Sequence, residues 1–220
     1  MKNNYFFFKR VFDFVVAASV LLILGPVLLL ICILIKTGSP GPCFYNGTRI
    51  GKNGKPFKIC KFRTMVIHAD KIGGSSTPEN DPRITAVGKT LRRYKLDELP
   101  QFWNVLTGEM SLAGPRPQVA WAVELYTPEE RALLNLRPGI TDYASIKFRN
   151  EAEILKGSLD PDKDYLEKIA PEKMRLELEY LRNCSFLEDL KILFATFLAI
   201  MGKETVWVMP RPAQDAGMAK

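Results

Sequence analysis

The sequence predicts a mainly α-helical fold of the α+β class, in which a membrane-embedded N-terminal helix precedes a small globular part with one β-hairpin. Three observations support this prediction. Residues 14–35 form an apolar run without a charge, and most later segments space their apolar residues as amphipathic helices do. Asn53-Gly54 is a strong hairpin signal. The chain has 220 residues, so the part outside the apolar run suffices for one compact domain.

The charge balance points to anionic partners. Lys and Arg number 31 against 24 Asp and Glu, which gives a net charge of +7. Such a surplus suits lipid headgroups, phosphorylated ligands or nucleic acid, and the apolar run favours the first two. Because the sequence carries no recognition-helix or RNA-binding motif, we expect no nucleic-acid partner.

The cysteines and the single histidine argue against a structural zinc site. The cysteines form no C-x-x-C pair, and His68 beside Asp70 has no second histidine to complete a metal site. Free thiols are typical of a reducing compartment, so we expect the globular part to face the cytosol. The cysteines are Cys32, Cys43, Cys60 and Cys184.

The apolar run is expected to stay in the mature protein. It is longer than the apolar core of a signal peptide, and no small-x-small cleavage site follows it. A helix over residues 14–35 would be about 33 Å long, enough to cross a membrane. Basic residues flank the run on both sides, and such residues prefer the cytosol. This symmetry predicts two cytosolic ends. The flanking residues include Lys2, Lys9 and Arg10 before the run, and Lys36, Arg49 and Lys52 after it.

Gly25 and Pro26 form the predicted membrane bend. Proline lacks the N–H that would continue the helix, and its ring clashes with the preceding turn, while glycine adds backbone freedom. A turn here would return the chain to the side from which it entered, as a re-entrant helix. Ser19 could donate a hydrogen bond to a carbonyl that the bend frees. A spanning helix with a proline kink is the alternative that these residues leave open.

The remaining elements follow from local patterns. Asn53-Gly54 between strand-forming residues predicts a β-hairpin within 42–65, and its basic face suits solvent or headgroups. Thr127, Pro128 and Glu130 are the signature of a capped helix start. We further expect a loop over 70–84, a helix over 87–107 that is broken or bent near Pro100, a rigid loop over 111–118, helices over 118–126 and 171–183, a turn over 137–141 and a disordered tail over 210–220.

The segment 186–201 is a strongly apolar helix candidate. Its apolar side chains cover more than half of the helix circumference, with Glu188, Asp189 and Lys191 gathered near one end. A buried core helix would show this pattern, and so would an amphipathic helix that lies in the membrane interface. The membrane segment at the other end of the chain favours the interface.

The densest cluster of reactive residues lies at 92–101, followed by a proline-rich loop over 111–117. Asp97 and Glu98 are adjacent carboxylates in a basic stretch. Adjacent acids are often a solvated helix face, but leucines on both sides indicate partial burial. Arg116, held between prolines, can clamp a phosphate with two hydrogen bonds. A carboxylate among fixed cations can attack phosphorus, and a second can hold Mg²⁺. The cluster therefore indicates phosphoryl transfer at an anionic-lipid surface.

Five motifs together carry a resemblance to a known family: KRVFDF (9–14), KFRTM (61–65), LDELPQFWNVLTGEMSLAGPRP (96–117), RPGIT (137–141) and SFLEDLKILFAT (185–196). With the Gly-Pro-interrupted apolar helix, they resemble the bacterial sugar transferase family, the monotopic polyprenyl-phosphate phosphoglycosyl transferases, in its minimal catalytic form. The resemblance extends over residues 7–200. It implies a re-entrant helix, interfacial helices and a small cytosolic part, on the cytosolic face of the bacterial inner (cytoplasmic) membrane.

The resemblance implies an enzyme that transfers a phosphosugar from a UDP-sugar to undecaprenyl phosphate. The products are undecaprenyl-diphosphate-sugar and UMP, and the step is the first membrane step of capsule, exopolysaccharide, O-antigen or glycoprotein-glycan assembly. A membrane-anchored scaffold or binding protein of a polysaccharide pathway is the alternative, but it has no need of Asp97, Glu98 and Arg116. The sugar, the pathway and the formation of a homodimer stay open.

The same resemblance assigns roles to individual residues. It implies that Asp97 is the nucleophile of a covalent aspartyl-phosphosugar intermediate. It implies that Glu98 holds Mg²⁺, with Asp97 as a second candidate ligand. Arg92, Arg116 and Arg149 match the basic residues that bind phosphate.

The chain departs from many relatives at three places. Gly25 stands where they have serine before the proline, residues 142–148 differ from their sequence after the RPGIT motif, and 150–173 replaces a shorter loop. The last two regions are candidates for sugar selection, and a variable surface loop explains them equally well. We expect the chain to divide into a re-entrant helix with its flanks (1–40), a catalytic domain (41–203) and a C-terminal tail (204–220).

Overall fold

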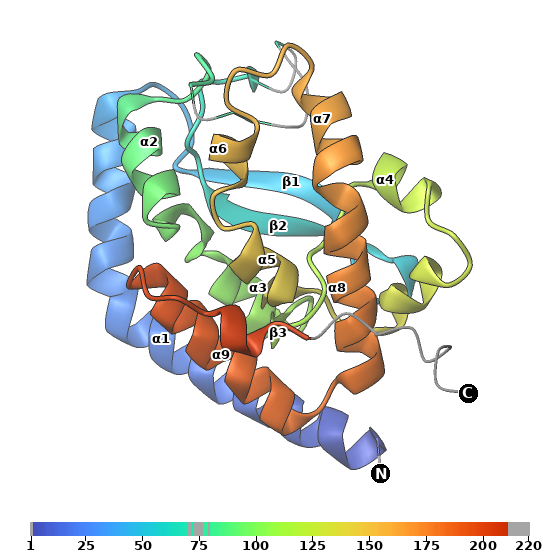
Figure 1. The fold of residues 1–220 in the computed structure, drawn as a ribbon. Helices are drawn as coiled ribbons and strands as arrows, with labels where there is room; N and C mark the ends of the chain where they lie inside the picture. Colours follow the sequence, from blue (N-terminus) through green and yellow to red (C-terminus); the bar gives the residue numbers. More distant parts are fainter. Residues whose placement is uncertain (1, 70–71, 73–76, 79, 211–220) are drawn as a thin grey trace.

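The computed structural model describes residues 2–69, 72, 77–78 and 80–210. Helices surround two small two-stranded sheets in this part of the chain, which confirms the predicted mainly α-helical fold with a small β part (Figure 1). The predicted tail lies almost wholly outside the described residues, as does much of the loop predicted over 70–84.

Helix α1 (Lys2–Gly38) is long and apolar enough to cross a membrane by length and composition, and most of its apolar stretch lies outside the packed core. The helix continues through Gly25 and Pro26, and it changes direction between its two halves in Figure 1. The predicted turn is therefore a bend within one helix and not a break. The Ser19 hydroxyl makes no hydrogen bond among the described residues, so it does not satisfy a carbonyl freed by the proline.

The hairpin has the predicted position and turn. Strands β1 (Phe44–Ile50) and β2 (Pro56–Phe62) pair in antiparallel register, and the short 3₁₀ turn η1 (Lys52–Gly54) joins them. Asn53 and Gly54 have φ of 58° and 72°, the left-handed conformation that this residue pair favours. The buried side chains of β2 are Phe57, Ile59 and Phe62.

The region predicted as a helix broken or bent near Pro100 contains two helices joined by a 3₁₀ turn. Helix α2 (Ala86–Arg93) ends before Lys95, whose φ of 56° is left-handed and redirects the chain. The turn η3 (Leu96–Glu98) follows, and α3 (Gln101–Thr107) starts after Pro100. The predicted break near Pro100 is present, since α3 begins directly after this proline, but the chain already leaves the helical conformation at Lys95.

A second sheet replaces a predicted loop and a predicted turn. Strands β3 (Ser111–Ala113) and β4 (Gly139–Thr141) pair in parallel, and each is too short to show a periodicity in the sequence. The two backbones approach so closely that a Cβ on Gly139 would lie 2.2 Å from the main-chain nitrogen of Gly114. Glycine is therefore required at position 139, because the backbone at Gly114 leaves no room there for a side chain.

The remaining elements of the described chain are α-helices and short 3₁₀ helices. The capping signature is confirmed, because the Glu130 N–H donates to Thr127 Oγ1 and the Thr127 N–H donates to Glu130 Oε2. The helices predicted over 118–126, 171–183 and 186–201 are present. The elements are α4 (Ala120–Glu124), η4 (Glu130–Asn135), α5 (Tyr143–Lys147), α6 (Glu151–Ile154), α7 (Pro161–Lys168), α8 (Ala170–Asn183), α9 (Phe186–Ile200) and η5 (Val206–Val208).

Helix α9 has a buried face and an exposed apolar face. Asp189, Ile192, Ala195 and Ala199 are buried in the core. The opposite side is also apolar but lies outside the core, and its exposed residues are Leu187, Leu190, Phe194, Phe197 and Ile200. Figure 1 shows α9 alongside the first half of α1, where the rings of Phe12 and Phe186 are 5.3 Å apart. The buried face agrees with the predicted core helix. The exposed apolar face is compatible with the predicted helix in the membrane interface, and that location stays a prediction.

Charged side chains of α1 dock this helix onto the globular part. Lys9 Nζ lies 2.7 Å from an Asp189 carboxylate oxygen, and Asp13 accepts a hydrogen bond of 2.7 Å from the Ser111 hydroxyl. Both charged side chains are buried. Arg10 donates to two main-chain carbonyls of α3. The motif that the sequence presents as a basic flank is thus an internal contact between α1 and the globular part.

Candidate active site

Asp97 and Glu98 lie in η3, where the chain passes between the hairpin and the second half of α1. Leu96 packs against a core cluster that includes Ile31 and Ile35 of α1. Residue Asp97 is 9% exposed, and Glu98 is half-buried. The two predicted catalytic acids are therefore held beside the membrane helix, on a turn with little freedom.

Glu98 is the centre of an ion-pair cluster. Its Oε1 lies 2.9 Å from Lys61 Nζ of β2 and also pairs with the Arg116 guanidinium from the loop after β3. Burial alone would raise the pKa of Glu98, but the charges of Arg116 and Lys61 outweigh burial and hold that pKa well below its usual range. Glu98 therefore stays ionised and brings three separate segments together.

Asp97 behaves in the opposite way. Burial raises the pKa of Asp97, and the adjacent negative charge of Glu98 raises it further. The positive charges of Lys61, Arg92 and Lys95 act against this rise. Asp97 Oδ1 is buried and has no hydrogen-bond partner among the described residues. A buried acid with an unpartnered oxygen, next to fixed cations, is available for an incoming ligand.

The structure brings two of the three predicted phosphate-binding arginines to these acids. Arg116 pairs with Glu98. Arg92 donates from Nε to Thr64 Oγ1 at 3.0 Å, and its charge acts on Asp97. Arg149 follows α5, is half-buried, and makes no hydrogen bond or ion pair with these groups in the described part of the chain.

Two further cations belong to the site although the sequence analysis assigned them no role. Lys61 pairs with Glu98 across 37 positions of sequence, and the charge of Lys95 acts on Asp97. The motif KFRTM and the basic face of the hairpin contained the signal for Lys61. Nothing in the local sequence distinguishes this lysine from its neighbours on β2, because its partner is supplied by tertiary packing.

The two carboxyls fit a Mg²⁺ ion that is shared with a phosphorylated ligand. Asp97 Oδ1 lacks a partner, and both ion pairs of Glu98 use Oε1, which leaves Oε2 free to ligate. The described residues contain no group of three or more His, Cys, Asp or Glu side chains that could hold a metal ion. Mg²⁺ commonly binds through one or two carboxylates together with substrate phosphates and water, so a pair of acids suffices for such a site.

A buried acid and an ionised acid, set among four cations beside a long apolar helix, define a membrane-associated site for an anionic ligand. The chain belongs to the bacterial sugar transferase family, whose model ("Bacterial sugar transferase") matches residues 4–203. The resemblance inferred from the motifs is thereby confirmed.

Curated relatives carry consistent names. The UDP-glucose:undecaprenyl-phosphate glucose-1-phosphate transferase of Escherichia coli (strain K12) is 43% identical over 193 residues, or 86% of this chain and 39% of the relative. The exopolysaccharide production protein ExoY of Sinorhizobium fredii is 38% identical over 207 residues, or 87% of this chain and 84% of the relative.

A third relative is named for a different sugar. The UDP-N-acetylgalactosamine-undecaprenyl-phosphate N-acetylgalactosaminephosphotransferase of Aeromonas hydrophila is 34% identical over 200 residues, or 90% of this chain and 44% of the relative. The chain thus spans less than half of the E. coli and A. hydrophila relatives and most of ExoY. The E. coli relative is named for glucose and the A. hydrophila relative for N-acetylgalactosamine. Membership of the family therefore does not identify the sugar of the donor.

Proposed function

We propose that the protein transfers a phosphosugar from a UDP-sugar to undecaprenyl phosphate, giving undecaprenyl-diphosphate-sugar and UMP. The observation that carries this proposal is the Asp97–Glu98 pair, held between Lys61, Arg92 and Arg116 beside the membrane helix. The names of the relatives support the same donor and acceptor classes. The reaction would be the first membrane step of glycoconjugate assembly, with exopolysaccharide favoured by the name of ExoY.

The first chemical step forms a covalent intermediate on Asp97. A carboxylate oxygen attacks the sugar-bearing β-phosphorus of the donor, and the bond from that phosphorus to the oxygen bridging the two phosphates breaks. The bridging oxygen leaves with the electron pair as part of UMP. The surrounding cations favour this step because they stabilise the negative charge that develops on the phosphate oxygens.

The second step transfers the phosphosugar to the lipid and regenerates the Asp97 carboxylate. A phosphate oxygen of undecaprenyl phosphate attacks the same phosphorus, and the bond between phosphorus and the Asp97 oxygen breaks. The products are the lipid diphosphate-sugar and the free aspartate, so neither step requires a proton transfer. Because Asp97 lies beside α1, a lipid phosphate at the membrane interface and a soluble donor can reach it in turn, as in other ping-pong reactions.

Mg²⁺ is part of this proposal, with Glu98 Oε2 and Asp97 Oδ1 as its protein ligands. Bound there, the ion would supply positive charge that offsets the negative charge of the donor phosphates. The ion pairs of Glu98 with Lys61 and Arg116 would orient the glutamate toward the ion.

The proposed location is the cytosolic face of the bacterial inner membrane, with α1 entering and leaving on that face. The bend of α1, the contacts that both halves of α1 make with the globular part and the exposed apolar face of α9 support a monotopic arrangement. In this arrangement α1 lies within one leaflet, and α9 rests along the interface beside it.

The test is UMP release from a panel of UDP-sugars in the presence of undecaprenyl phosphate. We expect one donor to be preferred, and we expect Asp97→Asn to abolish both UMP release and the phosphosugar adduct seen by intact mass measurement. Glu124→Gln, at an exposed position of α4, is the matched control and keeps full activity. An active Asp97→Asn variant would exclude the nucleophile assignment. A wild-type protein that releases no UMP but captures pathway enzymes would favour the scaffold alternative.

A further inference from the structure

Asn104 of α3 is a buried amide whose hydrogen bonds join this helix to the hairpin. The residue is 1% exposed. The Cys60 N–H donates to Asn104 Oδ1 at 2.8 Å, and Asn104 Nδ2 donates to the Lys58 carbonyl at 2.8 Å. In the described part of the chain, β2 pairs with no strand other than β1. The amide therefore takes the place of a neighbouring strand beside β2.

Glu109 fixes the orientation of that amide. Asn104 Nδ2 also donates to Glu109 Oε2 at 2.8 Å, and the main-chain carbonyl of Asn104 accepts the N–H groups of residues 108–110. An ionised carboxylate accepts hydrogen bonds and donates none. The amide nitrogen must therefore face Glu109 and the Lys58 carbonyl, while the amide oxygen faces the Cys60 N–H. Both donors and the acceptor of the side chain are matched, so the contact is specific for an amide.

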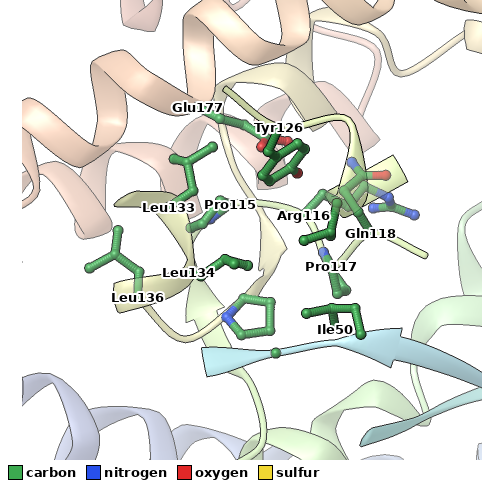
Figure 2. Close-up of a pocket in the computed structure, with 13 residues that line it drawn as sticks. Ile50, Pro115, Arg116, Pro117, Gln118, Tyr126, Leu133, Leu134, Leu136 and Glu177 are labelled. Atoms are coloured by element: carbon green, nitrogen blue, oxygen red, sulfur yellow. The ribbon is translucent and has the colours of Figure 1, made fainter. Parts of the chain in front are cut away.

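The hairpin is also attached through its other strand. The Ile50 N–H, at the end of β1, donates to the Gln118 carbonyl at 2.8 Å, and Figure 2 shows Ile50 beside Pro117 of the same loop. This loop and Ile50 line a cavity of about 20 Å³ together with the buried Glu177 of α8. The hydrogen bond joins two main chains, so shortening a side chain of α3 leaves the hairpin attached at β1.

The amide contact and the ion pair of Glu98 connect the same two segments. Lys61 follows Cys60 directly, and Lys61 Nζ lies 2.9 Å from Glu98 Oε1. Glu98 belongs to the turn that leads through Pro100 into α3, the helix of Asn104. A movement of β2 along α3 would therefore break both contacts together.

The apolar contacts of β2 do not by themselves fix its position along α3. Alternate side chains of a strand share a face, so Lys61 shares the face of Ile59, which packs with Val105 of α3. Apolar contacts have no preferred direction. A shift of β2 by two residues would keep this face against α3 and would carry Lys61 away from Glu98. The directional hydrogen bonds of the amide exclude that shift.

We propose that Asn104 is a positioning residue, which holds β2 in register on α3 and thereby keeps Lys61 against Glu98. This inference rests on the proposed function, in which Glu98 and the cations around it bind the donor diphosphate with Mg²⁺. Among the described residues, the Asn104 side chain bonds to Lys58, Cys60 and Glu109, so its effect on the ligand passes through Lys61. Without the amide, Lys61 has to be ordered when the ligand binds, and that ordering weakens binding.

The experiment is a double-mutant cycle between Asn104→Ala and Lys61→Met in the full-length protein. The calorimetric Kd for UDP with Mg²⁺ and the donor KM are measured for the wild type, each single variant and the double variant. We expect each single substitution to raise both quantities about tenfold, the change typical of one lost contact with a charged group. In the Lys61→Met background the Asn104 substitution should raise neither quantity further, because no lysine remains to be positioned.

Asn183→Ala is the matched control. Asn183 Nδ2 donates to a Glu179 carboxylate oxygen at 2.6 Å, at an exposed position near the end of α8. The substitution therefore removes an amide–carboxylate contact of the same kind outside the candidate site, and we expect the wild-type Kd and KM. If Asn104→Ala does not fold, Asn104→Ser, whose hydroxyl can still form a hydrogen bond, decides by the same cycle.

The outcomes separate the two proposals. A substitution of Asn104 that raises the Kd for UDP by the same factor with and without Lys61 would overturn the positioning role. So would one that lowers the unfolding temperature and leaves the Kd and the donor KM at the wild-type values. In both cases the amide would only stabilise the fold. A wild-type protein that neither binds UDP nor releases UMP contradicts the proposed function itself.

Discussion

Asp97 and Glu98 are neighbours in the sequence, yet their environments push their pKa values apart. Burial and the adjacent negative charge raise the pKa of Asp97, whereas Arg116 and Lys61 hold that of Glu98 low. A pair of acids separated in this way can divide two tasks between them. Glu98 stays ionised and pairs with Lys61 and Arg116, and in the proposed function Asp97 is the group that reacts.

The first residue-scale prediction concerns Glu98. We expect Glu98→Gln to lower the rate and to raise the Mg²⁺ concentration needed for half-maximal activity, because the amide lacks the charge that pairs with Lys61 and Arg116 and that would bind the proposed Mg²⁺ ion. Titration of UMP release with Mg²⁺ measures both effects. Glu124→Gln, on an exposed position of α4, is the control. An unchanged Mg²⁺ dependence in the Glu98 variant would argue against its role as ligand.

A second residue-scale prediction follows from Glu177. Its pKa is raised in the folded state, so above the ordinary glutamate value of about 4.3 the folded protein binds more protons than the unfolded chain. Stability is therefore highest below that value and falls as the pH rises through the raised pKa. We expect the unfolding temperature in detergent to fall from mildly acidic to mildly alkaline pH, and to fall less in Glu177→Gln. Equal slopes in the two proteins would contradict this account.

At the scale of elements, the approach of α2 to the end of the hairpin positions Arg92. The Thr85 N–H donates to the Thr64 carbonyl at 3.0 Å, and a Cβ on Gly88 would lie 2.0 Å from that same carbonyl oxygen. Only glycine allows the helix to lie this close. The short contact places Arg92 against the Thr64 hydroxyl and beside the two acids.

We therefore expect Gly88→Ala to push α2 away from Thr64. Overpacking of this kind costs about 1–3 kcal/mol of stability, and the shift of Arg92 should raise the donor KM as well. Thermal unfolding and steady-state kinetics measure the two effects. Lys89→Ala, on the exposed side of the same helix, should leave both nearly unchanged. A stable Gly88→Ala variant with the wild-type KM would show that α2 does not need this contact.

At the scale of the whole molecule, α1 is both the helix long and apolar enough to cross a membrane and a packing partner of the candidate active site. Its first half docks through Lys9 and Asp13, and its second half packs against Leu96 next to the reactive acids. The orientation of α1 in the membrane therefore sets the height of the site above the lipid. If both ends of α1 are cytosolic, Asp97 faces the phosphate of a lipid in the cytosolic leaflet.

The topology is testable with single cysteines at positions 3 and 38 in a background without the native cysteines. We expect a membrane-impermeant thiol reagent to label both positions in inside-out vesicles and neither in intact cells whose outer membrane has been permeabilised. Labelling at opposite faces would establish a spanning helix with a proline kink. Activity of each variant before labelling shows that the fold is retained.

Much of the fold follows from local sequence. The apolar run, the Asn53-Gly54 turn, the Thr127 cap and the helices over 171–183 and 186–201 are all found where the sequence places them. Each depends on residues within a few positions of one another, so a local pattern suffices. The pair β3–β4 was missed because strands of three residues gain their stability from a partner far along the chain.

The sequence alone specifies a membrane-associated sugar transferase with Asp97 and Glu98 adjacent, since these conclusions rest on composition and contiguous motifs. Folding adds Lys61 to the site from 37 positions away and turns Lys9 and Asp13 inward to dock α1. The family resemblance assigned Arg149 to phosphate binding, but in the described part of the chain Arg149 makes no hydrogen bond or ion pair with the residues of the site. The reason is physical: a side chain's charge state and partners depend on which distant segments are packed against it, and no local pattern records that arrangement.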